Sequence, residues 1–557
     1  MVEMLALKIR GDVEIRGIIV SGRSFKMTHY CDDTTVFVQN GHDADQIIEL
    51  VGDFGAVSGL ELNKDKCEFM WLGRKKGCGQ FICGCPPVEK TKILGVWFSA
   101  TENCSSVNFN AVESKIRSTL EQWSQRDLTI KGKVTVAKSL IVSQLVYIMT
   151  ASRIENKQLI TIQSHIMKFL WRGRPPKVAK ATLIMGIEKG GLKAPELSLM
   201  NRANRISWIG RMLRQPDAVF VQILQKRLRV SMNLLINVDF DEQWVRNRQI
   251  PEFYKEMLLW FKELHLAKEP NTPKEIRQQT LWHNKSVSVQ GRTLISSSQI
   301  EAEVILIEDL VDSEGHILTY KAFSERYPRV RVNPLTYMGW CHTVPSRWKY
   351  ALVGSASLSA EERNERCLIK IKDKDVALCL VKSGYYYALQ MPCIIPTAQT
   401  RWTAEGVNFQ DWEPVYERAF KTTASTKLQS LQFRIIHRYF PTRRFLCTRQ
   451  VVNDPFCDNC GLVDGLEHYF FDCAEVHAFW VELENNINAK GISLRFTRQD
   501  VLFGADGFSS IVNLIVLVAK QFIVNQNYGN ICKGMPLFRA ALLKMFNMER
   551  CIAIKNN

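Results

Sequence analysis

Apolar side chains recur every three or four positions along much of the first third of the chain, which is the spacing of an amphipathic helix. The pattern predicts three successive helices, over residues 109–123, 137–148 and 159–170. The third helix is expected to end at the basic segment 172–177, because its two prolines cannot continue a helix. Three successive helices after a small sheet predict an α+β fold whose later part is predominantly helical.

The sheet is expected in the first hundred residues, where β-prone runs replace the helical spacing. Such runs predict strands at 69–73 and 93–98. An earlier helix is expected to begin with a capping box formed by Asp43 and Gln46 and to end near Gly59. The small sheet therefore precedes the helical part.

Two adjacent aspartates, Asp32 and Asp33, lie in a Tyr-x-Asp-Asp turn between two β-prone runs. Paired divalent ions repel each other unless several carboxylates surround them, so this pair alone is an incomplete metal site. Successive side chains of a strand point to opposite faces, and we expect Asp32 to be the ligand and Asp33 the lesser partner. The few acids upstream are too close in the chain to belong to a further strand. An ordinary hairpin turn stays open as the alternative, because Asp is favoured in turns.

Further motifs follow this hairpin in a definite order. They are Ser58-Gly59-Leu60-x-x-Asn63-x-x-Lys66-x-Glu68, Leu94-Gly95-Val96, Trp123-x-x-Arg126-x-Leu128-Thr129-Ile130-x-Gly132-Lys133, Phe169-Leu170-Trp171-x-Gly173, Gly190-Gly191-Leu192 and Leu281-Trp282-His283-Asn284. No single piece is highly specific. Their order closely resembles the reverse transcriptases of non-LTR retrotransposons, the long interspersed element class, from the middle of the palm onward, and the resemblance covers nearly the whole chain.

The resemblance implies an RNA-directed DNA polymerase with magnesium (or manganese) held by Asp32 and Asp33. It implies that Lys66 lies near the phosphates of the incoming nucleotide and that Leu94 and Gly95 form the hairpin that grips the primer. The fingers, the strand with the first catalytic aspartate and the endonuclease of the family have no counterpart in the sequence. We therefore expect the C-terminal portion of a longer polyprotein, whose upstream part is a further partner.

Such a portion is expected to bind an RNA template and DNA but to be unable to polymerise alone. Two alternatives stay open. The chain is a non-catalytic nucleic-acid-binding module, or it is the relic of a decayed element.

Charge supports a nucleic-acid partner. The formal net charge is +17; residues 151–230 hold 16 Lys and Arg against 4 Asp and Glu, and residues 421–450 hold seven against none. Counterion release from a phosphate backbone favours such stretches, although a solvated surface without a ligand is the alternative. We expect nucleic acid to contact Leu94, Gly95, Lys131, Lys133, Arg172, Arg174, Lys177, Arg434, Arg438, Arg443 and Arg444.

In the second basic stretch, Arg434 and Arg438 are one helical turn apart, which predicts a row of cations on one helix. Tyr439 is expected to be exposed, where it can stack on unpaired bases. The alternative is a helix packed on the protein with its charged groups in water.

Four residues spaced as Cys457-x2-Cys460-x7-His468-x4-Cys473 have the number and mixture of ligands that tetrahedral zinc prefers. Gly461 permits the tight turn that brings the first two thiolates to one ion. Four protein ligands leave no open coordination position, so the spacing predicts one structural zinc ion in a zinc knuckle. The resembling family carries a similar C-terminal motif.

No signal peptide and no membrane-spanning segment are expected. Sixteen irregularly scattered cysteines without a secretory signal favour reduced thiols, and we expect a protein of the nucleus and cytoplasm that is not secreted. The predicted domains are a partial reverse transcriptase palm, a strongly basic helical thumb, a mixed connecting region, a basic helix with a zinc knuckle, and C-terminal helices, over residues 1–104, 105–214, 215–410, 411–490 and 491–557.

Overall fold

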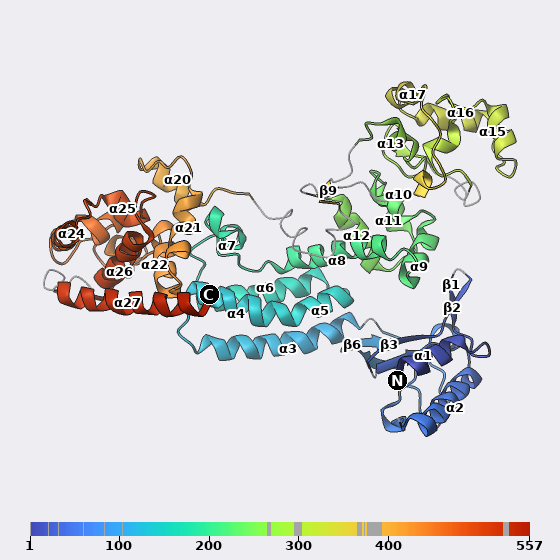
Figure 1. Ribbon diagram of the computed structural model, residues 1–557, viewed down its shortest axis with the longest axis horizontal. Helices are drawn as coiled ribbons and strands as arrows, with labels where there is room; N and C mark the ends of the chain where they lie inside the picture. The colour runs from blue at the N-terminus through green and yellow to red at the C-terminus, as the bar shows by residue number, and fades with distance from the viewer. Residues whose placement is uncertain are drawn as a thin grey trace. The chain divides into compact units, whose positions relative to one another are not determined.

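Short β-hairpins and many helices make up the chain (Figure 1), which confirms the predicted α+β class. The structure is a computed structural model. It describes residues 2–20, 22–31, 33–59, 61–82, 84–102, 104–264, 269–294, 303–364, 370–371, 374–375, 393–526 and 534–556.

The chain divides into two compact units, each built from separate stretches. The first unit comprises residues 1–112, 145–158 and 198–390, and the second unit comprises residues 113–144, 159–197 and 391–557. The five predicted domain ranges stay a prediction.

The first unit begins with a small packed region of hairpins and two helices. Its elements are α1 (Val2–Gly11), β1 (Ile18–Val20), β2 (Arg23–Phe25), β3 (Met27–Tyr30), β4 (Asp33–Val36), α2 (Gly41–Ser58), β5 (Lys90–Ile93) and β6 (Val96–Ser99). The strands pair as three antiparallel hairpins, β1 with β2, β3 with β4 and β5 with β6. Ile9 and Ile15 pack against Ile47 and Leu50 of α2, and this core holds α1 and α2 together.

Helix α2 begins earlier than the sequence predicted. Asn40 is the N-cap, since its side chain accepts a hydrogen bond from the amide of Asp43 at 2.9 Å. Asp43 is therefore the third helical residue, and the prediction that it opens the helix was wrong. The predicted end is confirmed: Gly59 adopts a left-handed conformation, with φ of 72°, and its amide donates to the carbonyl of Gly55.

The two predicted single strands have other structures. Residues 69–73 form no regular strand, because only Phe69 pairs, in an isolated bridge to Pro87. Residues 93–98 were predicted as one strand, but the chain reverses at Leu94 and Gly95, whose φ values are 46° and 84°, to form the β5–β6 hairpin. Positive φ at both central residues is the geometry of a tight two-residue hairpin turn.

The three predicted helices are confirmed. They are α3 (Ser105–Ser124), a continuous helix composed of α4 (Ile130–Val136), a π-helical turn (Ala137–Val142) and α5 (Ser143–Ala151), and α6 (Asn156–Trp171). Helix α6 ends at Trp171 because Arg172 and Gly173 take left-handed conformations, with φ of 53° and 72°. The two prolines follow this stop and do not cause it.

One helix of the described chain, Ile130–Ala151, is long and apolar enough to cross a membrane by length and composition. Of its most apolar stretch, 44% is buried inside the fold, and a core helix of a soluble protein passes the same test. The absence of a membrane span stays a prediction.

The rest of the first unit is mainly helical and has two further cores, one centred on α9 to α12 and one on α13 to α17. Its elements are α8 (Leu197–Arg214), α9 (Val219–Leu228), α10 (Met232–Ile236), α11 (Glu242–Asn247), α12 (Glu252–Lys262), α13 (Pro273–Arg277), β7 (Ser288–Val289), β8 (Arg292–Thr293), α15 (Tyr320–Arg326), α16 (Pro334–Thr343), α17 (Ser346–Leu352), β9 (Lys370–Ile371) and β10 (Lys374–Asp375).

The Leu-Trp-His-Asn motif serves this part of the fold. The indole of Trp282 donates to the carbonyl of Val304 at 2.6 Å, and Asn284 is fully buried and forms an isolated bridge with Phe240. The motif therefore ties neighbouring loops together.

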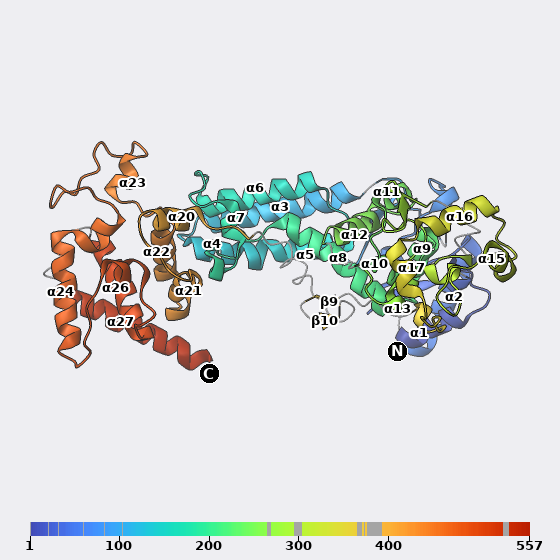
Figure 2. The same cartoon turned by 90° about the horizontal axis from the view of Figure 1, so that it is seen from above.

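The C-terminal part of the second unit shares one large aromatic core. Its helices are α20 (Thr397–Ala404), α21 (Glu413–Thr422), α22 (Thr426–Ile436), α23 (Arg443–Cys447), α24 (Ala474–Asn488), α25 (Arg498–Phe503), α26 (Ser510–Gln526) and α27 (Met535–Asn556). Helices α26 and α27 pack together in both views (Figures 1 and 2). The short α7 (Lys180–Ile184) belongs to the same unit.

Candidate nucleic-acid cleft and metal centre

The Tyr-x-Asp-Asp segment forms the turn of the β3–β4 hairpin. Tyr30 pairs with Asp33 across the turn, and Cys31 has a left-handed φ of 56°. The Asp33 side chain is exposed at the start of β4. Asp32 lies outside the described residues. The hairpin geometry is thus present, and its assignment as a metal ligand stays a prediction.

The other acids near this hairpin have local partners. Glu3 forms an ion pair with Arg10 at 3.0 Å, and a carboxylate oxygen of Asp12 accepts from the amide of Glu14 at 2.8 Å. Lys66 is exposed at the end of the 3-10 helix Lys64–Lys66. Across the described residues, one group of three or more clustered Cys, His, Asp or Glu side chains is suited to hold a metal ion, and it is far along the chain, beyond residue 450.

The Leu94–Gly95 turn is anchored to the helices that follow it. The hydroxyl of Tyr147, on α5, donates to the carbonyl of Leu94. Asn108 accepts from the amide of Trp97 at 2.8 Å and donates to its carbonyl at 3.0 Å, which fixes β6 to α3. The turn is therefore held in a definite position at the beginning of the helical bundle.

A basic cleft of about 800 Å³ lies within the second unit, and we name it the thumb cleft. It is lined by α3, the loop before α4, α4 and α6, which lie side by side (Figures 1 and 2). Five cations line it against two carboxylates, Glu121 and Asp127. The cations are Arg117, Arg126, Lys133, Lys168 and Arg172.

Some of these cations have partners in the fold. Arg172 forms an ion pair with Asp127, and the guanidinium of Arg126 lies 4.6 Å from the ring centre of Trp123. Arg117 and Lys168 are exposed on the walls of the cleft. The Nδ1 atom of His165 is buried and has no hydrogen-bond partner among the described residues. The cleft thus offers the exposed cations Arg117 and Lys168 to a ligand.

Lys133 is a structural cation, although the sequence predicted a nucleic-acid contact. It is buried, and its Nζ donates to the carbonyls of Phe169 at 2.9 Å and Leu170 at 3.4 Å, at the C-terminal end of α6. The negative end of the helix dipole favours a cation there. Burial lowers the pKa of Lys133 to about 8.

The remaining predicted contacts of this region differ in exposure. Lys131 lies over the ring of Phe420 at 4.6 Å, Arg174 is exposed and Lys177 is half-buried. The sequence reasoning missed Arg117, His165 and Lys168. The spacing of residues 165 and 168 was the available signal, because it puts these two side chains on one face of α6.

The predicted row of cations on α22 is wrong. The helix ends at Ile436, and Arg438 follows it in a left-handed conformation, with φ of 57°. Arg438 pairs with Glu405 and lies over the Trp402 ring at 4.1 Å. Desolvation by the surrounding protein lowers the pKa of Arg434.

Tyr439 is also not exposed as predicted. Its ring lies edge-on against Trp171, with the ring centres 6.0 Å apart, and against Phe433 at 6.2 Å. The neighbouring His437 is buried, makes a 2.8 Å hydrogen bond to the carbonyl of Gly190 and has its pKa lowered to about 4 by burial. This segment packs on the rest of the second unit, as the alternative described above expects.

Arg443 supports the segment that precedes the metal-ligating residues. Its guanidinium makes hydrogen bonds to Asp458, at 2.7 and 2.8 Å, and to Asp454, at 3.1 Å. Arg444 is exposed, and its amide donates to the carbonyl of Asp464 at 3.1 Å. The first of these arginines is engaged in the fold, and the second presents its side chain to solvent.

The four predicted zinc ligands lie together. The ligand atoms of Cys457, Cys460, His468 and Cys473 are all within 4.8 Å of one another, and the Sγ of Cys460 is 3.4 Å from the Nε2 of His468. Zinc–sulfur and zinc–nitrogen distances of about 2.3 and 2.0 Å in a tetrahedral site place neighbouring sulfur and nitrogen atoms about 3.5 Å apart. The geometry and the donor set therefore fit zinc.

Local backbone structure prepares this site for thiolates. Gly461, with φ of 70°, allows its amide to reach the carbonyl of Cys457, and the amide of Cys457 donates to the carbonyl of Leu462. Cys473 is the N-cap residue of α24, where the helix dipole favours a negative charge.

Backbone amides also donate to two of the sulfur atoms. Those of Asn459 and Cys460 point to the Cys457 thiol, and those of Glu475 and Val476 point to the Cys473 thiol. Burial nevertheless raises the pKa of Cys473 to about 12, so a bound cation is needed to hold it as a thiolate.

Comparison with known proteins finds a family model that matches the first hairpins. Residues 6–98 match the family described as "Reverse transcriptase (RNA-dependent DNA polymerase)". A stretch of 307 residues, 52% of the chain, is 22% identical to the "Transposon TX1 uncharacterized 149 kDa protein" of Xenopus laevis. The match spans 23% of the length of that protein.

Proposed function

Because this chain is related to the reverse transcriptases of non-LTR retrotransposons, we propose that it contributes palm, thumb and zinc-binding parts to an RNA-directed DNA polymerase and holds the nucleic acid there. The match over residues 6–98 carries the proposal, because the β3–β4 and β5–β6 hairpins lie inside it. Asp32 and Asp33 would hold magnesium, which supplies the Lewis acid of phosphoryl transfer.

We place the nucleic-acid contact in the thumb cleft. Arg117 and Lys168 are exposed there. Cations that neutralise phosphates release counterions, so binding by such a cleft weakens as salt rises. Of the residues predicted from sequence, the exposed Arg174 fits the same role.

We further propose that this 557-residue polypeptide does not extend a primer by itself. The upstream acids Glu3 and Asp12 have local partners in the structure. Two divalent ions need more carboxylates than the turn supplies.

The experiment measures binding and primer extension in the same samples. Single-stranded RNA, duplex DNA and an RNA–DNA hybrid are titrated at several salt concentrations, with magnesium and deoxynucleotides present. We expect salt-dependent binding without extension. Binding should weaken on the order of tenfold in the Arg117→Ala, Lys168→Ala double variant. A matched control is the Lys115→Ala, Lys157→Ala double variant, whose residues lie on the same helices outside the cleft.

Each part of the proposal can fail separately. No binding by the unmodified chain contradicts the nucleic-acid role, and equal losses in the two double variants contradict the thumb cleft as the site. Primer extension that Asp33→Ala abolishes contradicts the proposed inactivity and shows that the metal site is complete.

A further inference from the structure

A second basic surface lies in the first unit, where the connecting region, for which the sequence indicated no role, meets the β1–β2 hairpin. The surface contains two concavities, of about 630 and 360 Å³, which share Lys226. They are lined by the end of α9, the end of α11 and the β1–β2 hairpin. We name them together the α9 groove. Its cations are Arg23, Lys226, Arg227, Arg229 and Arg248.

Charge in the α9 groove has one sign. None of the described residues that line it is acidic, and the others are amides, apart from two isoleucines, Ile19 and Ile223. The acids that begin α11 have other partners, since Asp241 caps the helix and Glu242 lies within ion-pair distance of Arg246 and Lys262. The described lining of the groove therefore supplies cations, among them the exposed Lys226 and Arg227, and no carboxylate.

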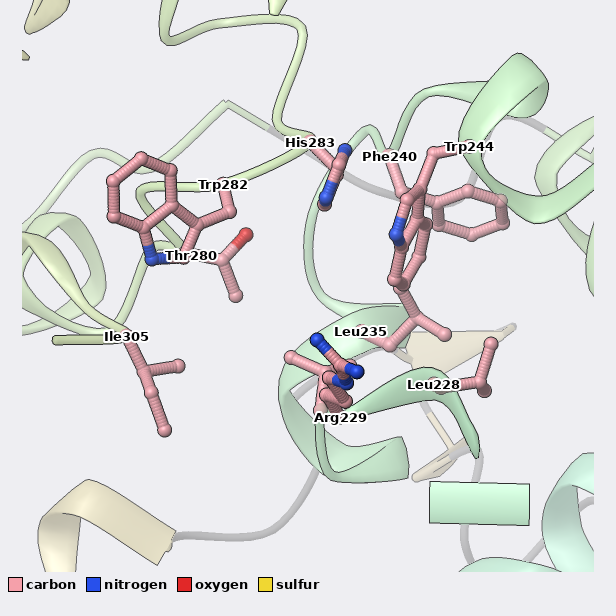
Figure 3. Close-up of a pocket in the computed structure, with 10 residues that line it drawn as sticks. Leu228, Arg229, Leu235, Phe240, Trp244, Thr280, Trp282, His283 and Ile305 are labelled. Carbon is pink, nitrogen blue, oxygen red and sulfur yellow. The ribbon is translucent and has the colours of Figure 1, made fainter. Parts of the chain in front are cut away.

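The groove cations are held in place by the fold. Arg229 ends α9 in a left-handed conformation, with φ of 61°. The guanidinium of Arg248 lies 5.0 Å from the ring centre of Trp244, and Trp244 stacks on His283 with the ring centres 4.6 Å apart. Figure 3 shows these two rings face to face, with Arg229 drawn below them near Leu235. Part of the positive surface is thus positioned before any ligand binds.

We propose that the α9 groove binds the sugar–phosphate backbone of RNA or DNA without reading its sequence. A phosphodiester chain carries charges at regular intervals, which suits several guanidinium and ammonium groups along one open groove. Side-chain amides such as those of Asn247 and Gln249 can donate to phosphate and sugar oxygens. The proposal takes its ligand class from the proposed function but uses residues of the other unit.

Two double variants test the contribution of the groove. Lys226→Ala with Arg227→Ala removes two exposed groove cations and leaves alanine, a strong helix former, at the end of α9. Lys321→Ala with Arg329→Ala removes the same charge from exposed positions of the first unit that do not line the groove. Affinity for a fluorescently labelled RNA of twenty nucleotides and for the corresponding DNA duplex is measured by anisotropy over a salt series.

The groove variant should bind on the order of tenfold more weakly, and the slope of log K against log salt should fall by about 1.4 to 1.8, for two lost phosphate contacts. The control should keep the unmodified slope. Equal losses in the two variants overturn the proposal, because they show an effect of net charge alone. Competition by poly-glutamate at equal charge concentration also overturns it, because the groove then accepts any polyanion.

Photo-crosslinking locates the contact independently of affinity. A benzophenone amino acid at Ile223, in the groove, should crosslink to labelled RNA or DNA, whereas the same group at the exposed Leu335 should not. This result should persist in the Arg117→Ala, Lys168→Ala variant, so a failure of the thumb cleft leaves the groove testable. No crosslink at Ile223 under saturating binding overturns the proposal.

Discussion

At the scale of single residues, Lys520 is a cation enclosed by the core of the second unit. Its side chain is 1% exposed, and its Nζ donates to the amide oxygen of Gln432 and to the carbonyl of Leu502 at 3.5 Å. Burial, with a smaller contribution from Arg418, lowers the pKa of Lys520 to about 7. The core therefore holds a group that titrates near neutral pH.

This titration predicts a pH dependence of stability. Between pH 7 and 10.5 the unfolded chain binds the proton that folded Lys520 has lost, so the free energy of unfolding rises with pH, by at most about 1.4 kcal/mol per pH unit. Lys520→Met should remove this contribution, whereas Lys544→Met, at an exposed site on α27, should keep it. Urea unfolding of the three proteins at pH 7, 8 and 9 measures the difference. Identical slopes in all three contradict the assignment.

A glycine is required at position 191 because the neighbouring backbone leaves no room for a side chain. A Cβ atom there would lie 2.1 Å from the carbonyl oxygen of Met185 and 2.6 Å from that of Thr182. Backbone cannot move aside as a side chain can, so Gly191→Ala should lower the free energy of unfolding by about 1 to 3 kcal/mol. At Gly186 the added Cβ meets only the flexible side chain of Glu188, and Gly186→Ala should cost less. Urea midpoints of the two variants compare them, and equal losses contradict the steric argument.

At the scale of elements, the sequence predicts structure best where the determining contacts are local. The apolar spacing locates α3 and α6, and the Cys-His spacing locates the cluster of four ligand residues, because both patterns depend on residues close in sequence. Phe69 was misjudged because its pairing depends on Pro87, which is distant in sequence. Arg438 was misjudged because the sequence does not show where α22 stops.

The thumb cleft marks a further limit of sequence reasoning. Arg117 and Lys168 come from different helices, and only the packing of α3 against α6 brings them to one concavity. A basic composition indicated a polyanion partner. It could not distinguish exposed cations from Lys133, whose Nζ is hydrogen-bonded to a carbonyl at the C-terminal end of α6.

The metal centre provides a test at this scale. Cys460→Ser should lose stoichiometric zinc and open the segment between residues 455 and 480 to protease, because the metal's binding energy contributes to local folding. Cys447→Ser is the matched control, since Cys447 lies on neighbouring α23 outside the cluster. Atomic emission measures the zinc content of both variants, and limited proteolysis measures the exposure of this segment. The β3–β4 and β5–β6 hairpins should be unaffected. Unchanged zinc in Cys460→Ser contradicts the assignment.

At the scale of the whole molecule, the proposed nucleic-acid contacts are two basic surfaces, one in each unit. Neither surface is the arginine row that the sequence predicted around residues 434 and 438. Arg434 and Arg438 are half-buried, and the exposed cations of the two surfaces lie instead on α3, α6 and α9.

Each unit is built from separate stretches of the chain, which limits the fragments that can be expressed as folded domains. His437 bonds to Gly190, and Tyr439 packs on Trp171, so the C-terminal helices depend on segments more than two hundred residues earlier. An expression fragment that starts at residue 393 would expose these surfaces to water and would be prone to aggregate. A fragment chosen as one continuous stretch of sequence therefore lacks part of its unit. The zinc-ligand region is best studied in the intact polypeptide.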